Sequence, residues 1–97
     1  MPGAARIGDT LSDTDHIAQG SPDFFINNKS IALKGNATTG HGCFVPSVIT
    51  DPVASTFFVN GIPVAFEGST NVPHVCPASG AVDSGAVIQF SPDFFVE

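Results

Sequence analysis

Charged residues are scarce in this sequence. Only 12% of its 97 residues are charged, and its three cations, Arg6, Lys29 and Lys34, leave a net charge of −6. An average soluble domain carries roughly 25% charged residues, so ion pairs cannot be the main source of stability here. Nucleic acids and anionic lipids are bound through clustered Lys and Arg side chains. The shortage of cations therefore excludes both as expected partners.

Long apolar runs are also missing. No stretch approaches the roughly 20 apolar residues that span a bilayer, and residues 1–11 lack the apolar segment of a signal peptide. We therefore expect a protein that is made in the cytoplasm. If it leaves the cell, it does so by a route that needs no signal peptide.

Tryptophan and tyrosine are absent, whereas the chain contains nine Phe, ten Gly and eight Pro. Such a composition is typical of short strands joined by tight turns. No apolar periodicity of 3.6 residues persists over more than about two helical turns. The sequence predicts a single all-β domain over residues 1–97. Because the core of so small a domain is only marginally stabilising, we expect an additional staple.

An internal repeat with a period of about 33 residues organises the chain. Residues 21–28 (SPDFFINN) return as residues 54–61 (ASTFFVNG), and the start of the unit returns as residues 91–96 (SPDFFV). A unit of this size cannot bury its apolar face alone. We therefore expect the three copies to pack around a shared axis as a pseudo-threefold body.

Residues 57–66 are the clearest predicted β-hairpin, because Asn60-Gly61 is the strongest short-range signal for a type I′ turn. If Val59 pairs with Ile62, alternate residues share a face of the hairpin. The first copy turns the same way through Asn27-Asn28, since asparagine tolerates a positive φ. The predicted apolar face of the second copy carries Phe57, Val59, Ile62, Val64 and Phe66.

All three histidines of the chain follow Gly-polar segments at equivalent places in the repeat. They are His16, His41 and His74, and the last two are followed two residues later by Cys43 and Cys76. Three imidazoles and a thiolate satisfy the tetrahedral nitrogen and sulfur preference of zinc. One histidine per repeat, closed by one thiolate, predicts the ligands His16, His41, His74 and Cys76, with Cys43 in reserve. Iron suits such a site less well than zinc.

Two alternatives to metal binding remain. Each histidine could be a surface or satisfied polar residue, and Cys43 and Cys76 could form a disulfide, although cytosolic thiols stay reduced. Catalysis has less support, because a cysteine closes the metal shell and no nucleophile-elbow pattern is present. We expect no enzyme. The acidic residues have the contexts of caps and turn formers: Asp9, Asp13, Asp15, Asp51 and Asp83.

Four segments in order resemble PAAR-repeat proteins, the spike-tip proteins of type VI secretion systems and related contractile phage tails. The segments are residues 1–9 (MPGAARIGD), 39–46 (TGHGCFVP), 58–65 (FVNGIPVA) and 73–77 (PHVCP). The resemblance spans essentially the whole chain. It implies a small cone of β-hairpins with a metal site near its sharp point, formed by three His and one Cys.

The function implied by this resemblance is structural. The blunt base of the cone would dock, one copy to three chains, on a trimeric β-helical spike that is driven through a target cell envelope, and effectors could be carried at the tip. The protein would be assembled on the spike and delivered outside the cell, or form part of a virion tail. The runner-up function is a free-standing small zinc-binding interaction module, and a more distant one is a hydrolase with an open zinc site. Candidates for core and base are Phe24, Phe25, Phe57, Phe58, Phe94 and Phe95.

Overall fold

Eight short strands and no helix make up the computed structural model, which describes residues 1–97. The strands are β1 (Phe25–Ile26), β2 (Lys29–Ser30), β3 (Ile49–Thr50), β4 (Val53–Val59), β5 (Ile62–Ala65), β6 (Thr70–Asn71), β7 (His74–Val75) and β8 (Val82–Asp83). They form four two-stranded antiparallel sheets, β1 with β2, β3 with β6, β4 with β5 and β7 with β8. The prediction of an all-β chain is confirmed. The structure holds no helix of the length and apolarity needed to cross a membrane.

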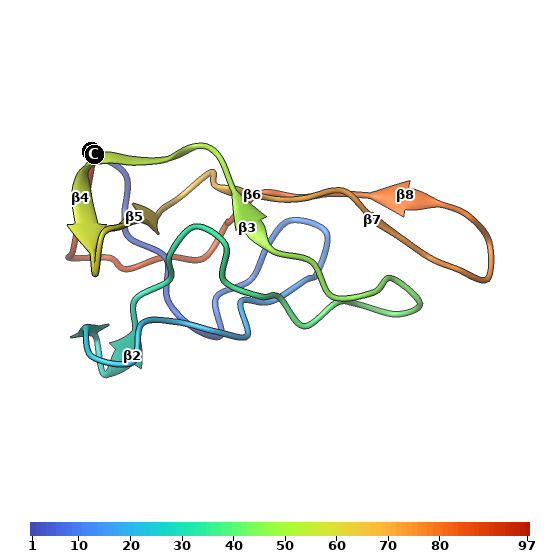
Figure 1. The fold of residues 1–97 in the computed structure, drawn as a ribbon, viewed down its shortest axis with the longest axis horizontal. Coiled ribbons are helices and arrows are strands. Elements are labelled where there is room, and N and C mark those ends of the chain that lie inside the picture. The colour runs from blue at the N-terminus through green and yellow to red at the C-terminus, as the bar shows by residue number, and fades with distance from the viewer.

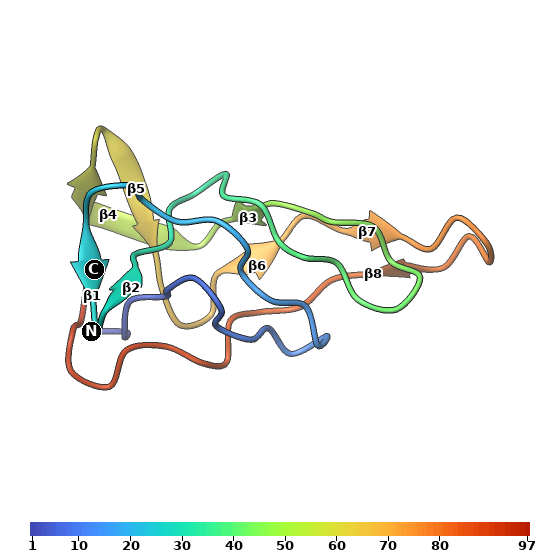
Figure 2. The same cartoon turned by 90° about the horizontal axis from the view of Figure 1, so that it is seen from below.

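The molecule is elongated, with extents of 39 × 24 × 22 Å along its principal axes. Strands β1, β2, β4 and β5 lie at one end, which we call the broad end, whereas the hairpin of β7 and β8 extends to the opposite, narrow end (Figure 1). Both chain termini lie at the broad end (Figure 2).

Three equivalent alanines link the copies of the repeat through a closed cycle of backbone hydrogen bonds. Ala5 N donates to Ala65 O at 3.0 Å, Ala65 N donates to Ala32 O at 2.9 Å, and Ala32 N donates to Ala5 O at 2.9 Å. All three residues are fully buried. Because each copy gives one donor and one acceptor to its neighbours, the cycle satisfies the buried backbone groups at the centre of the molecule.

In the third copy, segments from the two ends of the chain pair with each other in place of a continuous hairpin. Ala4 N donates to Phe94 O at 2.9 Å, and Val96 N donates to Pro2 O at 2.9 Å, so residues 2–4 act as the second strand of this copy. The sequence repeat by itself indicates only the first strand of this copy, residues 91–96. The ring of three copies is therefore closed by segments from opposite ends of the chain.

Both predicted turns adopt the expected backbone. Asn60 and Gly61 have φ angles of 54° and 79°, and Asn27 and Asn28 have φ angles of 52° and 61°. A type I′ turn requires a positive φ at both central residues. The residues of these two dipeptides thus determine where the chain reverses its direction.

The register of the β4–β5 hairpin follows the prediction only near its turn. Val59 pairs with Ile62 as expected, but farther from the turn Val53 pairs with Ala65, so the register shifts in between. The predicted one-sided apolar face is wrong for Ile62, which is exposed while Val59 is buried. The register shift lies between Val53 and Phe58, so residues of β4 on its two sides need not share one face. Ile62 is instead exposed beside the exposed turn residues Asn60 and Gly61.

Two apolar clusters fill the interior. The first consists of Ala4, Ile26, Ile31, Leu33, Ala54, Val59, Val64 and Val96, with the half-buried rings of Phe24, Phe57, Phe66 and Phe94 packed against it. The second consists of Ala5, Leu11, Ile17, Ala32, Ile49, Ala65 and Val87. Neither cluster includes a residue from the 40–46 or 72–83 segments. The narrow end therefore has no apolar core of its own and must be stabilised in another way.

Candidate metal centre

Loops that reach toward the narrow end bring Asp13, His41 and His74 together. One potential ligand atom from each lies within 4.8 Å of the others. The Nε2 atoms of His41 and His74 are 3.1 Å apart, and Asp13 Oδ2 lies 3.1 Å from His74 Nε2 and 3.4 Å from His41 Nε2. This group could hold a metal ion.

His41 is positioned by a tight loop. His41 and Phe44 exchange backbone hydrogen bonds of 3.2 and 2.8 Å, and Gly42 between them has a φ of 54°. Gly40 has a φ of 77°, and a Cβ atom there would lie 2.6 Å from Phe44 O, so only glycine fits. The His41 ring stacks on the Phe44 ring with centroids 4.7 Å apart. Loop and stacking together hold the imidazole in place.

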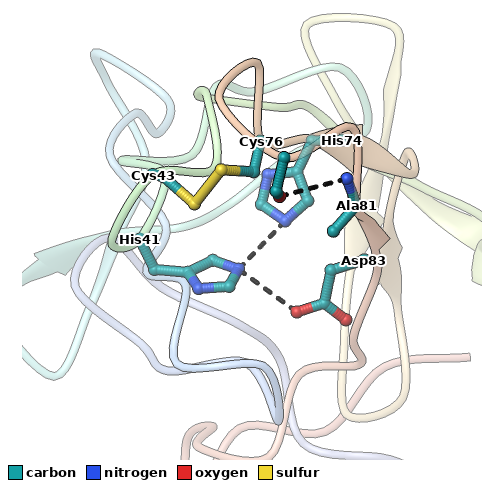
Figure 3. Close-up of a disulfide and its surroundings, with 7 residues drawn as sticks. His41, Cys43, His74, Cys76, Ala81 and Asp83 are labelled. Atoms are coloured by element: carbon teal, nitrogen blue, oxygen red, sulfur yellow. Dashed lines mark hydrogen bonds and ion pairs between the residues drawn. A yellow bond between two sulfur atoms is a disulfide. The ribbon is translucent and has the colours of Figure 1, made fainter.

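His74 lies in β7, directly opposite Asp83 of β8. Side chains in such a cross-strand pair lie on the same face of the hairpin. Asp83 Oδ2 is 3.5 Å from His41 Nε2, and Figure 3 shows its carboxylate pointing toward that imidazole. Asp83 is therefore a fourth group at the edge of the cluster.

The hydrogen bonds of His74 determine which of its nitrogens is free. His74 Nδ1 lies 2.7 Å from Val45 O, and a carbonyl oxygen can only accept, so Nδ1 carries a proton. In the neutral ring the lone pair of Nε2 then faces Asp13 Oδ2, which is also an acceptor. A proton, carried by His74 or by Asp13, or a metal ion must therefore lie between these two atoms. A carbonyl that orients the outer nitrogen is the usual support of a metal-binding histidine.

Asp13 is held by Asn71, whose buried amide Nδ2 donates to Asp13 Oδ2 and to Asp15 Oδ2, each at 3.0 Å. Gly85 N in turn donates to Asn71 Oδ1 at 2.8 Å. Burial works to raise the pKa of Asp13, but the hydrogen bonds from Asn71, Asp15 N and His74 outweigh it, so the pKa is lowered. The carboxylate form, which is the form that binds metals, is thus the favoured one.

The same contacts act on His74 in the opposite direction. Burial works to lower the pKa of His74, but the hydrogen bonds to Val45 O and Asp13 outweigh it and raise the pKa. The site therefore attracts positive charge. A proton meets this demand at low pH, and a metal ion competes for the same place at higher pH.

The structure brings together two of the four ligands predicted from the sequence, His41 and His74. His16 is exposed, and its ring lies outside the cluster. Cys76 is buried and is joined to Cys43 by a disulfide with a Cα–Cα distance of 5.0 Å, which was the alternative to thiolate ligation. In this form of the protein, neither cysteine offers a thiolate.

The sequence pattern does not indicate either acidic member, because Asp13 and Asp83 have the contexts of turn formers. A signal for Asp13 exists in the spacing of three equivalent glycines, Gly8, Gly35 and Gly68, which all have φ angles between 88° and 96°. His41 and His74 each lie six residues after their glycine, whereas His16 comes two residues later than that. In the first copy the loop turns back before His16, and Asp13 takes the position facing the other two copies.

Comparison of the chain with models of protein families, with curated proteins and with solved structures finds no match. Fold and site together define a small all-β protein with a His/Asp group that could hold a metal ion.

Proposed function

We propose that this protein is a structural spike-tip protein that caps and sharpens a trimeric β-helical spike of a contractile injection machine. The observation that carries the proposal is the threefold arrangement of aromatic residues at the broad end. The resemblance of the sequence to PAAR-repeat proteins gives the proposal its direction. In this function the protein is made in the cytoplasm, is assembled on the spike and leaves with it.

Three phenylalanine rings at equivalent positions of the repeat meet one another. The ring centroids of Phe24, Phe57 and Phe94 are 5.8, 6.1 and 5.6 Å apart, and the planes cross at 87°, 74° and 80°. Edge-to-face packing of this kind is the favoured contact between aromatic rings. The nearly equal separations give the broad end a local threefold arrangement, which matches a threefold shaft.

A cycle of polar contacts repeats this arrangement around the aromatic rings. Asn60 Nδ2 donates to Asp23 Oδ1 at 3.0 Å, and Asn27 Nδ2 donates to Asp93 Oδ1 at 2.9 Å. The third link comes from the hydroxyl of Thr56, the counterpart of Asp23 and Asp93, which donates to Glu97 O at 2.6 Å. Each copy thereby contacts the next. The three hairpins therefore form one rigid platform rather than three independent ones.

The residue that follows each of these rings is exposed. Phe25, Phe58 and Phe95 have exposed fractions of 58%, 52% and 47%. Three large apolar side chains at equivalent positions are a costly surface to leave in water, and such patches mark interaction sites. A partner with three identical chains offers one matching site to each phenylalanine, which is why we propose a trimer rather than a monomer.

Mixing the protein with a trimeric β-helical spike fragment tests the proposal. We expect a complex of one copy to three chains in a mass measurement, and loss of that complex when the three exposed phenylalanines are replaced together by serine. The matched control replaces Val48, Val72 and Val82 together by serine. These three valines are also exposed, but they do not belong to the repeated Phe-Phe segments. Retained binding in the control, with an unchanged melting temperature in both variants, supports the proposal. If the unaltered protein forms no such complex, it is not a spike tip. The better-supported function is then that of a free-standing zinc-binding module.

We propose further that the metal ion is a structural Zn²⁺. A narrow end without an apolar core gains folding energy from a metal that joins its loops, because binding energy at a structural site is folding energy. Removal of the metal by a chelator is therefore expected to lower the melting temperature. A melting temperature that chelator does not change would contradict the structural role.

A further inference from the structure

We infer that the disulfide-bonded protein binds its metal ion through His41, His74, Asp13 and Asp83, and not through three imidazoles and a thiolate. This inference deepens the structural metal role proposed above and is independent of the spike. It assigns two carboxylates to places that the sequence pattern had given to His16 and Cys76.

The mutual distances among the donors of Asp13, His41 and His74 are close to those of a tetrahedral site, and Asp83 approaches one of these donors. Zinc binds nitrogen and oxygen ligands at about 2.0–2.2 Å, so the ligand atoms of a tetrahedral site lie roughly 3.3–3.6 Å apart. The three separations among the His41, His74 and Asp13 atoms are 3.1, 3.1 and 3.4 Å, and Asp83 Oδ2 lies 3.5 Å from His41 Nε2. To admit the ion, the His41 and His74 rings would shift outward and the Asp83 side chain would turn toward the other donors.

Three of the four donors are already oriented by other contacts. Val45 O holds the outer nitrogen of His74, and the ring of Phe44 stacks on His41. Asn71 donates to the same Asp13 oxygen that faces both imidazoles. A carboxylate oxygen has enough lone pairs to accept from an amide and bind a metal. Preorganised donors of this kind lose little conformational freedom when a metal binds.

Asp83 is the most exposed member of the set. Its side chain is 38% exposed, and only its Oδ2 atom approaches His41. Because Asp83 lies opposite His74 in the β7–β8 pair, a side-chain rotation brings its carboxylate toward the other donors without moving the backbone. It can therefore close the site after the metal has bound the other three.

The disulfide explains why no thiolate is needed. Cys43 and Cys76 each stand two residues after a metal-facing histidine, so the bond between them ties the two histidine segments together. This covalent bond holds the two histidine segments together, as a cysteine ligand bound to the metal would otherwise do. It also leaves the site without the negative charge of a thiolate, which the second carboxylate replaces.

The charge of the chain suits this donor set. Two carboxylates neutralise a divalent ion, and neither of them is paired with a Lys or Arg side chain. Arg6 is paired with Asp9, and Lys34 is paired with Asp51. Asp13 and Asp83 instead have only imidazoles as ion-pair partners.

The test uses the full chain purified without reductant, with the disulfide verified by mass. Zinc affinity and stoichiometry are measured by competition with a chromophoric chelator, and Co²⁺ serves as a spectroscopic probe. We expect one metal per chain, at least a tenfold loss of affinity in Asp83→Asn and in Asp13→Asn, and wild-type affinity in His16→Ala. Asp51→Asn is the matched control for loss of an exposed carboxylate. Because Asp13 is buried and its substitution could unfold the chain, Asp83→Asn alone keeps the inference falsifiable.

Cobalt distinguishes the two donor sets directly. A thiolate ligand gives a sulfur-to-cobalt charge-transfer band in the near ultraviolet, and we expect none in the oxidised protein or in the Cys43→Ser/Cys76→Ser variant, which should still bind one metal. A sulfur band in the unreduced protein, metal loss in His16→Ala, or full affinity in Asp83→Asn would each overturn the inference. A chain that binds metal through the carboxylates but forms no spike complex would instead refute only the spike-tip function.

Discussion

The carboxylate of Asp9 is bound by the guanidinium of Arg6 through two parallel hydrogen bonds, Nε to Oδ2 and Nη2 to Oδ1, each of 2.9 Å. Arg6 N also donates to Asp9 Oδ2 at 2.8 Å, and both residues are buried. The remaining Arg6 nitrogen, Nη1, donates to Asn27 Oδ1 at 3.0 Å. Arg6 thus joins its own loop to the turn of the first hairpin, which gives the arginine of the Ala4-Ala5-Arg6 string a structural role.

Removal of Asp9 is expected to leave Arg6 buried without its counter-charge. We predict that Asp9→Ala lowers the free energy of unfolding by about 3–5 kcal/mol, measured by denaturant titration. The matched control is Lys34→Ala, which breaks a salt bridge between two exposed side chains and should change stability by less than about 1 kcal/mol. Equal losses in the two variants would show that burial of the Arg6 pair is not what makes it important.

The three alanines of the hydrogen-bond cycle at the centre of the molecule are fully buried. We predict that Ala32→Leu lowers the free energy of unfolding by about 1–3 kcal/mol, because added carbon atoms in a packed interior force neighbouring atoms apart. Thermal or denaturant unfolding measures the loss. Ala18→Leu, at an exposed alanine, should change stability by no more than about 0.5 kcal/mol. A tolerated leucine at Ala32 would mean that the cycle can open without penalty.

The parts of the fold that the sequence predicted are those decided by neighbouring residues. Asn60-Gly61 and Asn27-Asn28 determine their turns through positive φ angles, so the turns and the adjacent Val59–Ile62 pair follow from a few residues. The closure of the third hairpin depends instead on residues 2–4 meeting the other end of the chain. No local preference indicates such a contact.

The candidate site divides in the same way. His41 and His74 follow their glycines at the same spacing, so the repeat alone predicts that they converge. The loop before His16 is longer by two residues, and which of its side chains turns inward depends on packing against Asn71, far away in the sequence. Asp83 joins the site only through its strand pairing with His74. The residue spacing of the repeat therefore predicts where the site lies, but it does not predict all of its donor groups.

The cycle of polar contacts at the broad end predicts that the pKa of Asp23 depends on Asn60. The Ser21 hydroxyl and the Asn60 amide hold the pKa of Asp23 below its ordinary value of 3.8. A carboxyl whose pKa is lowered by folding stabilises the protein above that ordinary pKa, and this contribution is lost as pH falls through the lowered value. We expect Asn60→Ala to raise the pKa of Asp23 and to reduce stability at neutral pH more than at about pH 2.

Carboxyl chemical shifts followed by NMR during an acid titration measure this effect. Asp93 provides the internal control, because its pKa is lowered mainly by Asn27 and should not respond to Asn60→Ala. The reciprocal variant, Asn27→Ala, should shift Asp93 and spare Asp23. An Asp23 pKa that is the same in the Asn60→Ala variant would contradict the polar cycle.

The disulfide is expected to supply much of the stability that the small core cannot. Cys43 and Cys76 are separated by 33 residues, and closing a loop of that length restricts the unfolded chain. We predict that Cys43→Ser/Cys76→Ser lowers the free energy of unfolding by about 2–4 kcal/mol, measured in the presence of chelator so that no metal contributes. Reduction of the unaltered protein should give a loss of similar size, because both treatments remove the same constraint. If the double variant is as stable as the unaltered protein, or if the unaltered protein carries two free thiols after purification without reductant, the narrow end is not held by this bond. The joining of the two histidine segments would then depend on the metal alone.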